Sequence, residues 1–336
     1  MLTTTKTPAA PLPPLSSTST PVLAENLALA SLRVLACVAK ADGELTPAER
    51  LALENAFTGL QMPAGVTPKS LLEEKIDLDA QLRLFTTPEA RESLYQSVLG
   101  MIHVRGPCTP EEQKQLDHVR STLQISDEKA SLARRILDEA KDTVLTGNIV
   151  AVTDPVRRTA EVKSDTLKYS VLGGALGAFP IPGLAIATDL AVVGVQLKLV
   201  RDIGQRWGHT VDKDAAASLL GGLGLGTGAR IAVSNLAKLI PAWGSAVGAS
   251  TSFASTWALG KIADKYFESG MKADLAVLKS DFTAAQSEGR QAYDSNKGLV
   301  ESKNKQNETI LKGLNADLAA GRLKMKDYTA RIEQLA

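Results

Sequence analysis

Residue types that usually carry chemistry are scarce in this chain of 336 residues. Its two cysteines, Cys37 and Cys108, cannot build a disulfide framework and form no CxxC pair, which indicates a reducing compartment. Three histidines make a multi-histidine metal centre hard to build. With 38 Lys and Arg against 37 Asp and Glu, we expect no nucleic-acid partner that depends on bulk positive charge. We therefore expect a protein that is not an enzyme and has no cofactor, apart from the divalent cation considered below.

Long apolar runs are lacking as well. Residues 1–22 have no apolar core of a signal peptide, and their Pro, Ser and Thr content predicts a disordered tail. The longest uncharged run, 239–260, is diluted by Pro241 and by Ser and Thr, so it is no clean span of about 20 apolar residues. We expect a cytoplasmic protein, with peripheral or re-entrant contact at the inner membrane as the alternative.

What the chain does contain is a set of sequence signals for helix starts. Thr-Pro pairs begin at residues 46, 67, 87 and 109, and a Thr cap followed by Pro at the first helical position starts helices. The pairs at 46 and 109 extend into T-x-x-E capping boxes. Together with apolar spacing, they predict an all-α fold with helices near 24–40, 47–61, 88–104, 110–123 and 126–145, and shorter ones after 67 and in 77–86.

An acidic turn precedes the helix expected at 47–61. Asp42, Glu44 and Glu49 place three carboxylates within eight residues, which is the oxygen density that hard cations require. The spacing is not that of an EF-hand. A plain helix–turn–helix junction explains the same residues, because Asp-Gly favours a turn and Thr and Glu cap a helix.

Residues 30–50 resemble the first signature of the TerB-like tellurite-resistance domain, and Gly106, Thr109, Glu111, Glu112 and Leu116 resemble its repeated half. The resemblance covers about 25–146 and implies an all-α bundle with an acidic face that could bind a metal. The residues that would carry the metal are Asp42, Glu44 and Glu49, with Glu111 and Glu112 in the second half. The second turn, 105–108, lacks the matching acidic residue, which argues against a symmetric two-site centre.

The middle of the chain, about 167–270, holds 16 of the 26 glycines. Two similar segments, 174–208 and 229–270, predict a pair of apolar helical hairpins that end on Gly208 and Gly270. Small-xxx-small pairs such as Gly173 and Gly177 let helices approach closely, in a membrane or in a tight bundle. Both insertion of these hairpins in lipid and burial in protein fit this pattern.

Residues 165–270 resemble the C-terminal domain of unknown function of YcjF-like membrane proteins and some GTPases, although no P-loop is present. The resemblance implies membrane association, and the hairpin residues expected to serve membrane contact or packing are Pro182, Gly183, Asp189, Arg230, Pro241, Trp243 and Gly244.

Asp189 is the one charge in an apolar stretch, so it needs a partner or a shifted pKa. Arg230 and Lys238 are the expected partners, in a structural ion pair or in an ion relay. Basic residues bracket the first hairpin and face either anionic lipid or water. They are Arg157, Arg158, Lys163 and Lys168 before it, and Lys198, Arg201 and Arg206 after it.

The remaining residues, 271–336, are polar and helical, with a break expected at Gly298 or in 303–307. Residues 311–335 resemble a short helix–turn–helix of the SHOCT type, which implies docking or oligomerisation.

The predicted organisation is a tail at 1–22, a helical bundle at 23–146, a linker at 147–166, the hairpin domain at 167–270 and a helical tail at 271–336. We expect a non-enzymatic bacterial protein that associates with a membrane surface or a membrane protein in stress response or envelope maintenance. Its acidic front module, 23–146, would sense a cation or a partner. The alternatives are a soluble homo-oligomeric helical scaffold and a metal-binding module of the tellurite-resistance type.

Overall fold

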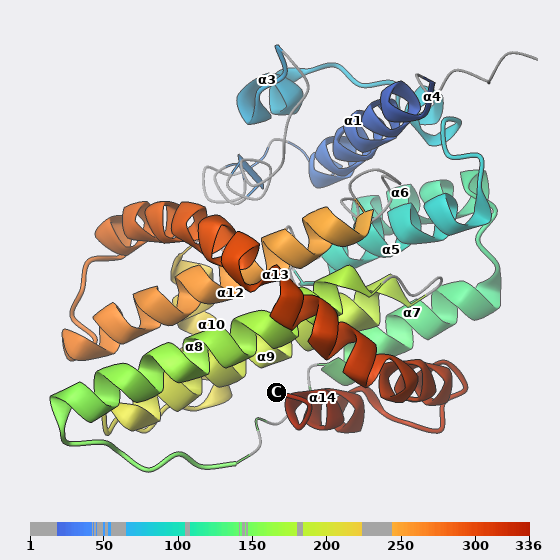
Figure 1. Cartoon of the computed structure of the whole chain (residues 1–336). Coiled ribbons are helices and arrows are strands. Elements are labelled where there is room, and N and C mark those ends of the chain that lie inside the picture. The colour runs from blue at the N-terminus through green and yellow to red at the C-terminus, as the bar shows by residue number, and fades with distance from the viewer. Residues whose placement is uncertain are drawn as a thin grey trace, which may run out of the picture.

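A computed structural model describes residues 19–41, 43, 45, 50, 53–54, 65–104, 108–140, 142, 145, 147–179, 184–223 and 244–336. Within these ranges the chain forms helices and no strands, which confirms the all-α prediction. Figure 1 shows the front helices stacked above and beside a group of long central helices.

The front of the chain contains six of these helices. They are α1 (Ser19–Ala39), α3 (Pro68–Glu73), α4 (Leu78–Leu82), α5 (Pro88–Val104), α6 (Pro110–Thr122) and α7 (Asp127–Ala140).

Three of the predicted Thr-Pro helix starts lie in the described ranges, and all three are confirmed. The Thr109 side chain accepts a hydrogen bond from the Glu112 amide, and Glu112 accepts one from the Thr109 amide in return. Thr67 forms the same reciprocal pair with Ser70. The Thr87 hydroxyl accepts from the amide of Ala90. The start at Thr46 and most of the helix expected at 47–61 lie outside the described residues.

The middle of the chain supplies α8 (Pro155–Ala178), α9 (Ala185–Arg206), α10 (Lys213–Gly222) and α12 (Gly244–Glu268). Because α8 begins at Pro155, it runs through the position at which the sequence analysis separated a linker from the hairpin domain. The helices α8 and α9 pack against each other as the first predicted hairpin. The first helix of the second hairpin and its Pro241 turn lie outside the described residues.

Among the described helices, the most extensive contact joins α8 to α12, and small residues contribute to it. A Cβ atom added to Gly177 would stand 2.4 Å from the carbonyl oxygen of Gly248, and one added to Gly173 would stand 3.0 Å from the Thr256 hydroxyl. The prediction that small-xxx-small pairs allow backbones to approach is confirmed for these two glycines, and here the approach is within protein.

The helices α9 and α12 end in the same way. Gly208 and Gly270 both have positive φ, of 84° and 64°. The residue after each glycine donates a backbone hydrogen bond to a carbonyl five positions earlier, from His209 to Gly204 and from Met271 to Tyr266. This is the Schellman arrangement, in which glycine takes the left-handed conformation at low cost. The two predicted glycine ends are thereby confirmed.

The last part of the chain forms α13 (Leu275–Ala319) and α14 (Met325–Glu333). The predicted break at Gly298 or in 303–307 is wrong, because α13 continues through both as one helix of 45 residues. A buried stripe that includes Leu278, Phe282 and Leu311 holds α13 against its neighbours. This packing outweighs the low helix propensity of the single exposed residue Gly298. The turn to α14 is at Gly321, with a φ of 72°, which confirms the helix–turn–helix expected in 311–335.

One hydrophobic core joins the front bundle to the central helices. The same cluster of buried residues includes Leu35 and Leu94 from the front, Val195 from α9 and Tyr328 from α14. Helix α9 lies at its centre and contacts α5, α7, α8, α10, α12 and α14.

Candidate functional site

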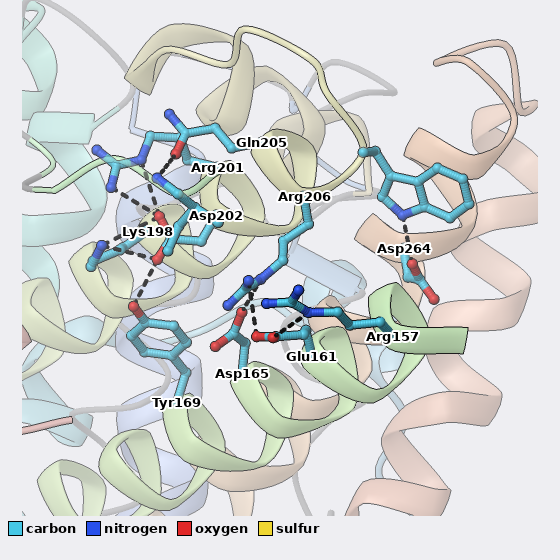
Figure 2. Close-up of polar contacts among 12 residues, drawn as sticks. Arg157, Glu161, Asp165, Tyr169, Lys198, Arg201, Asp202, Gln205, Arg206 and Asp264 are labelled. Atoms are coloured by element: carbon cyan, nitrogen blue, oxygen red, sulfur yellow. Dashed lines mark hydrogen bonds and ion pairs between the residues drawn. The ribbon is translucent and has the colours of Figure 1, made fainter. Parts of the chain in front are cut away.

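A cluster of buried polar side chains surrounds Asp202 on α9. Its carboxylate is 1% exposed, and it accepts hydrogen bonds from Tyr169 at 2.8 Å, Lys198 at 2.9 Å and Arg201 at 2.9 Å. Figure 2 shows these side chains converging from α8 and α9 on one carboxylate. We call Tyr169, Lys198, Arg201 and Asp202 the Asp202 cluster.

Local helix geometry builds this cluster. Lys198 and Asp202 stand four residues apart, so both project from the same face of α9. That face is turned toward α8, which brings the Tyr169 hydroxyl to the carboxylate. A buried ionised carboxylate is stable only when it is paired and hydrogen-bonded, and two cations and a phenol supply both.

The acceptor sites of Asp202 are occupied within the protein. A carboxylate has about four lone-pair sites, and the donors of Tyr169, Lys198 and Arg201 approach both of its oxygens. Burial, followed by the negative charge of Asp202, raises the pKa of the Tyr169 phenol far above its ordinary value, so the phenol remains a donor. The arrangement is suited to hold α8 on α9 rather than to accept a proton from a substrate.

A second row of ion pairs continues toward the start of α8. Arg206 reaches Asp165 and Glu161, each at 2.9 Å, and Arg157 stands 3.5 Å from Glu161 (Figure 2). Lys198, Arg201 and Arg206, which the sequence analysis offered to anionic lipid or water, therefore point toward carboxylates of the protein.

The end of this row is an aromatic contact. The Trp207 indole N–H donates to Asp264 at 2.7 Å, and the Arg158 guanidinium lies 3.7 Å from the centre of the Trp207 ring. Burial raises the pKa of the Asp264 carboxyl, and the hydrogen bond from Trp207 opposes that rise. This contact ties the ends of α9 and α12 to the start of α8.

The residues predicted to bind metal are placed only in part. Glu112 is buried and serves the capping box at the start of α6, and Glu111 is exposed beside it. Asp42, Glu44 and Glu49 lie outside the described residues. In the part of the chain that is described, no three Asp, Glu, His or Cys side chains come together as a metal site. The cation site at the acidic turn therefore stays a prediction.

The residues predicted for membrane contact or packing are also placed in part. Asp189 is buried within α9, and Gly244 is the first residue of α12. The other five lie outside the described residues: Pro182, Gly183, Arg230, Pro241 and Trp243. Among the helices described, none is both long enough and apolar enough to cross a membrane.

The Asp202 cluster was not predicted from the sequence. Lys198 and Arg201 were expected only as part of the basic flank of the first hairpin, and no role was predicted for Tyr169 or Asp202. The available signal was the spacing of Lys198 and Asp202 among Leu199, Val200 and Ile203, which places opposite charges within an apolar segment.

The fold and the cluster define an all-α protein with a buried ionic seam between two central helices. Comparisons with protein families, with curated proteins and with solved structures find no match. The TerB-like, YcjF-like and SHOCT-like resemblances therefore stay predictions.

Proposed function

We propose that this protein is a non-enzymatic helical scaffold that assembles with other copies of itself and acts by holding partners in place. The observation that favours a helical scaffold over inserted hairpins is the enclosure of α9, of which 18 of 22 residues are buried. Its apolar surface, and the small-residue faces of α8 and α12, are covered within one chain. The described apolar segments thus need no lipid to cover them, which favours the scaffold over inserted hairpins.

Large apolar side chains that remain exposed supply a surface for self-association. Met271, Leu275 and Val277 are each about half exposed where α12 turns into α13, and Ile310 is exposed farther along α13. Met271, Leu275 and Val277 lie within seven residues of one another, and we take them as the contact because exposed apolar patches mark interaction sites.

The experiment is light scattering on the purified protein in buffer without detergent. We expect a discrete species with the mass of two or more 35.5 kDa chains. Val277→Glu should shift it toward the monomer, whereas Leu84→Glu, at an exposed position on the front bundle, should not. A monomer at every concentration would overturn the proposal.

Membrane-surface association is the second candidate, because two exposed side chains favour it. Val150 and Val156 are 82% and 79% exposed, and Arg157 beside them is also largely exposed. Exposed apolar side chains can enter the boundary between head groups and acyl chains, and a neighbouring cation is attracted to anionic lipid. The protein should then pellet with anionic vesicles at low salt, and Val150→Asp with Val156→Asp should abolish pelleting. Wild-type protein that stays in the supernatant would exclude this candidate.

A further inference from the structure

A groove runs between α8 and α13, which crosses α8 in Figure 1. It is open to solvent and has a volume of about 370 Å³, which lies at the small end of the range for small-molecule sites. The lining residues have the same sequence spacing on both helices. Each helix contributes positions i, i+3, i+4 and i+7 from one face, starting at Ser164 on α8 and at Leu299 on α13.

The groove combines an apolar surface with two lysines, and the terminal residue Ala336, whose carboxylate is an anion, lines it as well, so the lysines leave one positive charge in excess. Leu167 and Val171 from α8 face Leu299 from α13 across it. Leu299 is 54% exposed, so a bound molecule would remove apolar surface from water. Lys168 and Lys303 occupy the i+4 position on their respective walls.

These two lysines differ from those of the Asp202 cluster. Within the described residues neither Lys168 nor Lys303 forms an ion pair, and the nearest interaction of Lys168 is with the Tyr169 ring, 5.5 Å from its centre. Two cations beside apolar side chains complement a molecule with one anionic end and an aliphatic body.

We propose that the α8–α13 groove binds a medium-chain fatty carboxylate, with the head group between Lys168 and Lys303 and the chain against Leu167, Val171 and Leu299. The carboxylate gains two charge-assisted hydrogen bonds from the ammonium groups. A medium chain matches a volume at the small end of the range for small-molecule sites. This binding function is separate from self-association.

The test is calorimetric titration of the full-length protein with laurate below its micelle concentration. The purification tag belongs at the amino end, because Ala336 borders the groove. We expect saturable binding of one laurate per chain and no saturable binding of dodecyltrimethylammonium, which has the same chain and the opposite charge.

Surface variants assign the binding to the groove. The double variant K168A/K303A should weaken laurate binding at least tenfold, and Leu299→Ser should weaken it several-fold. Lys163→Ala and Lys305→Ala, at exposed positions on the same helices outside the groove, should leave it unchanged. Because all these side chains are at least partly exposed, the variants should keep the wild-type circular dichroism.

Three outcomes would overturn the proposal: no saturable laurate binding, equal binding of the cationic analogue, or laurate binding that K168A/K303A leaves intact. Vesicles of anionic diacyl phospholipid separate the two lipid sources. If the protein bound these vesicles through Lys168 and Lys303 but did not bind laurate, the two lysines would contact a membrane surface. That result would also overturn the proposal.

Discussion

At the scale of single residues, Asp202 is the centre of a buried ionic cluster. Removing one member of a buried ion pair costs about 3 to 5 kcal/mol, because the remaining charges lose the group that offset their desolvation. We expect Asp202→Asn to lower the free energy of unfolding by this amount in urea denaturation. Tyr169→Phe removes one neutral donor and should cost about 1 to 2 kcal/mol. Equal costs for the two variants would contradict the assignment of Asp202 as the centre of the cluster.

The raised pKa of Asp264 makes the free energy of unfolding depend on pH in a defined direction. Its pKa is raised in the folded state by burial, so the folded protein holds this proton more tightly than the unfolded chain does. The stability that this proton contributes is complete below the ordinary carboxyl pKa and is lost as pH rises through the raised value.

Asp264→Asn keeps an acceptor for Trp207 and removes this titration. At pH 7 its free energy of unfolding should lie within about 1 kcal/mol of wild type. Denaturation curves between pH 4 and pH 7 should show that wild type loses stability relative to the variant as the pH rises. If wild type instead gained stability relative to the variant as the pH rises, the pKa of Asp264 would be lowered, and the hydrogen bond from Trp207 would outweigh the effect of burial.

At the scale of elements, the contact between α8 and α12 depends on the absence of side chains. Gly177→Ala would place a Cβ against the Gly248 carbonyl oxygen, a backbone atom that cannot rotate away. We expect a loss of about 1 to 3 kcal/mol of stability by overpacking, despite the better helix propensity of alanine.

Gly298→Ala is the matched control, since a Cβ there meets open space within α13. It should raise stability by about 0.5 to 1 kcal/mol, as an exposed helical glycine predicts. Thermal unfolding of both variants compares the two effects. A stabilising Gly177→Ala would mean that α8 and α12 can move apart at little cost.

The elements that sequence could predict are those with local causes. Thr67 and Thr109 start helices because their own side chains cap them, and Gly208 and Gly270 end helices because glycine adopts a positive φ. The break expected near Gly298 failed because distant residues, packed along α13, decide whether one exposed glycine interrupts a helix. The groove and the Asp202 cluster need the crossing of helices that are far apart in sequence, which spacing alone does not give.

At the scale of the whole molecule, the shared core predicts cooperative unfolding. Leu94 is fully buried in α5, and Leu94→Ala should cost about 2 to 5 kcal/mol. Because α5 packs on α9, the loss should also move the transition seen by tryptophan fluorescence, although the tryptophans lie at residue 207 and beyond. Leu84→Ala, at an exposed position, should leave that midpoint unchanged. A fluorescence midpoint that ignores Leu94→Ala would show that the front bundle unfolds independently.

The enclosure of α9 also fixes how its backbone amides meet solvent. A helix covered on every side has no local opening that exposes it while the rest stays folded, so its amides exchange hydrogen for deuterium only when the whole molecule opens. Those of Val195 and Leu199 should therefore be among the slowest in the protein, with an opening free energy equal to that from denaturation. The exposed residues of α13 near Gly298 should exchange much sooner, so exchange rates would map the order in which the protein comes apart.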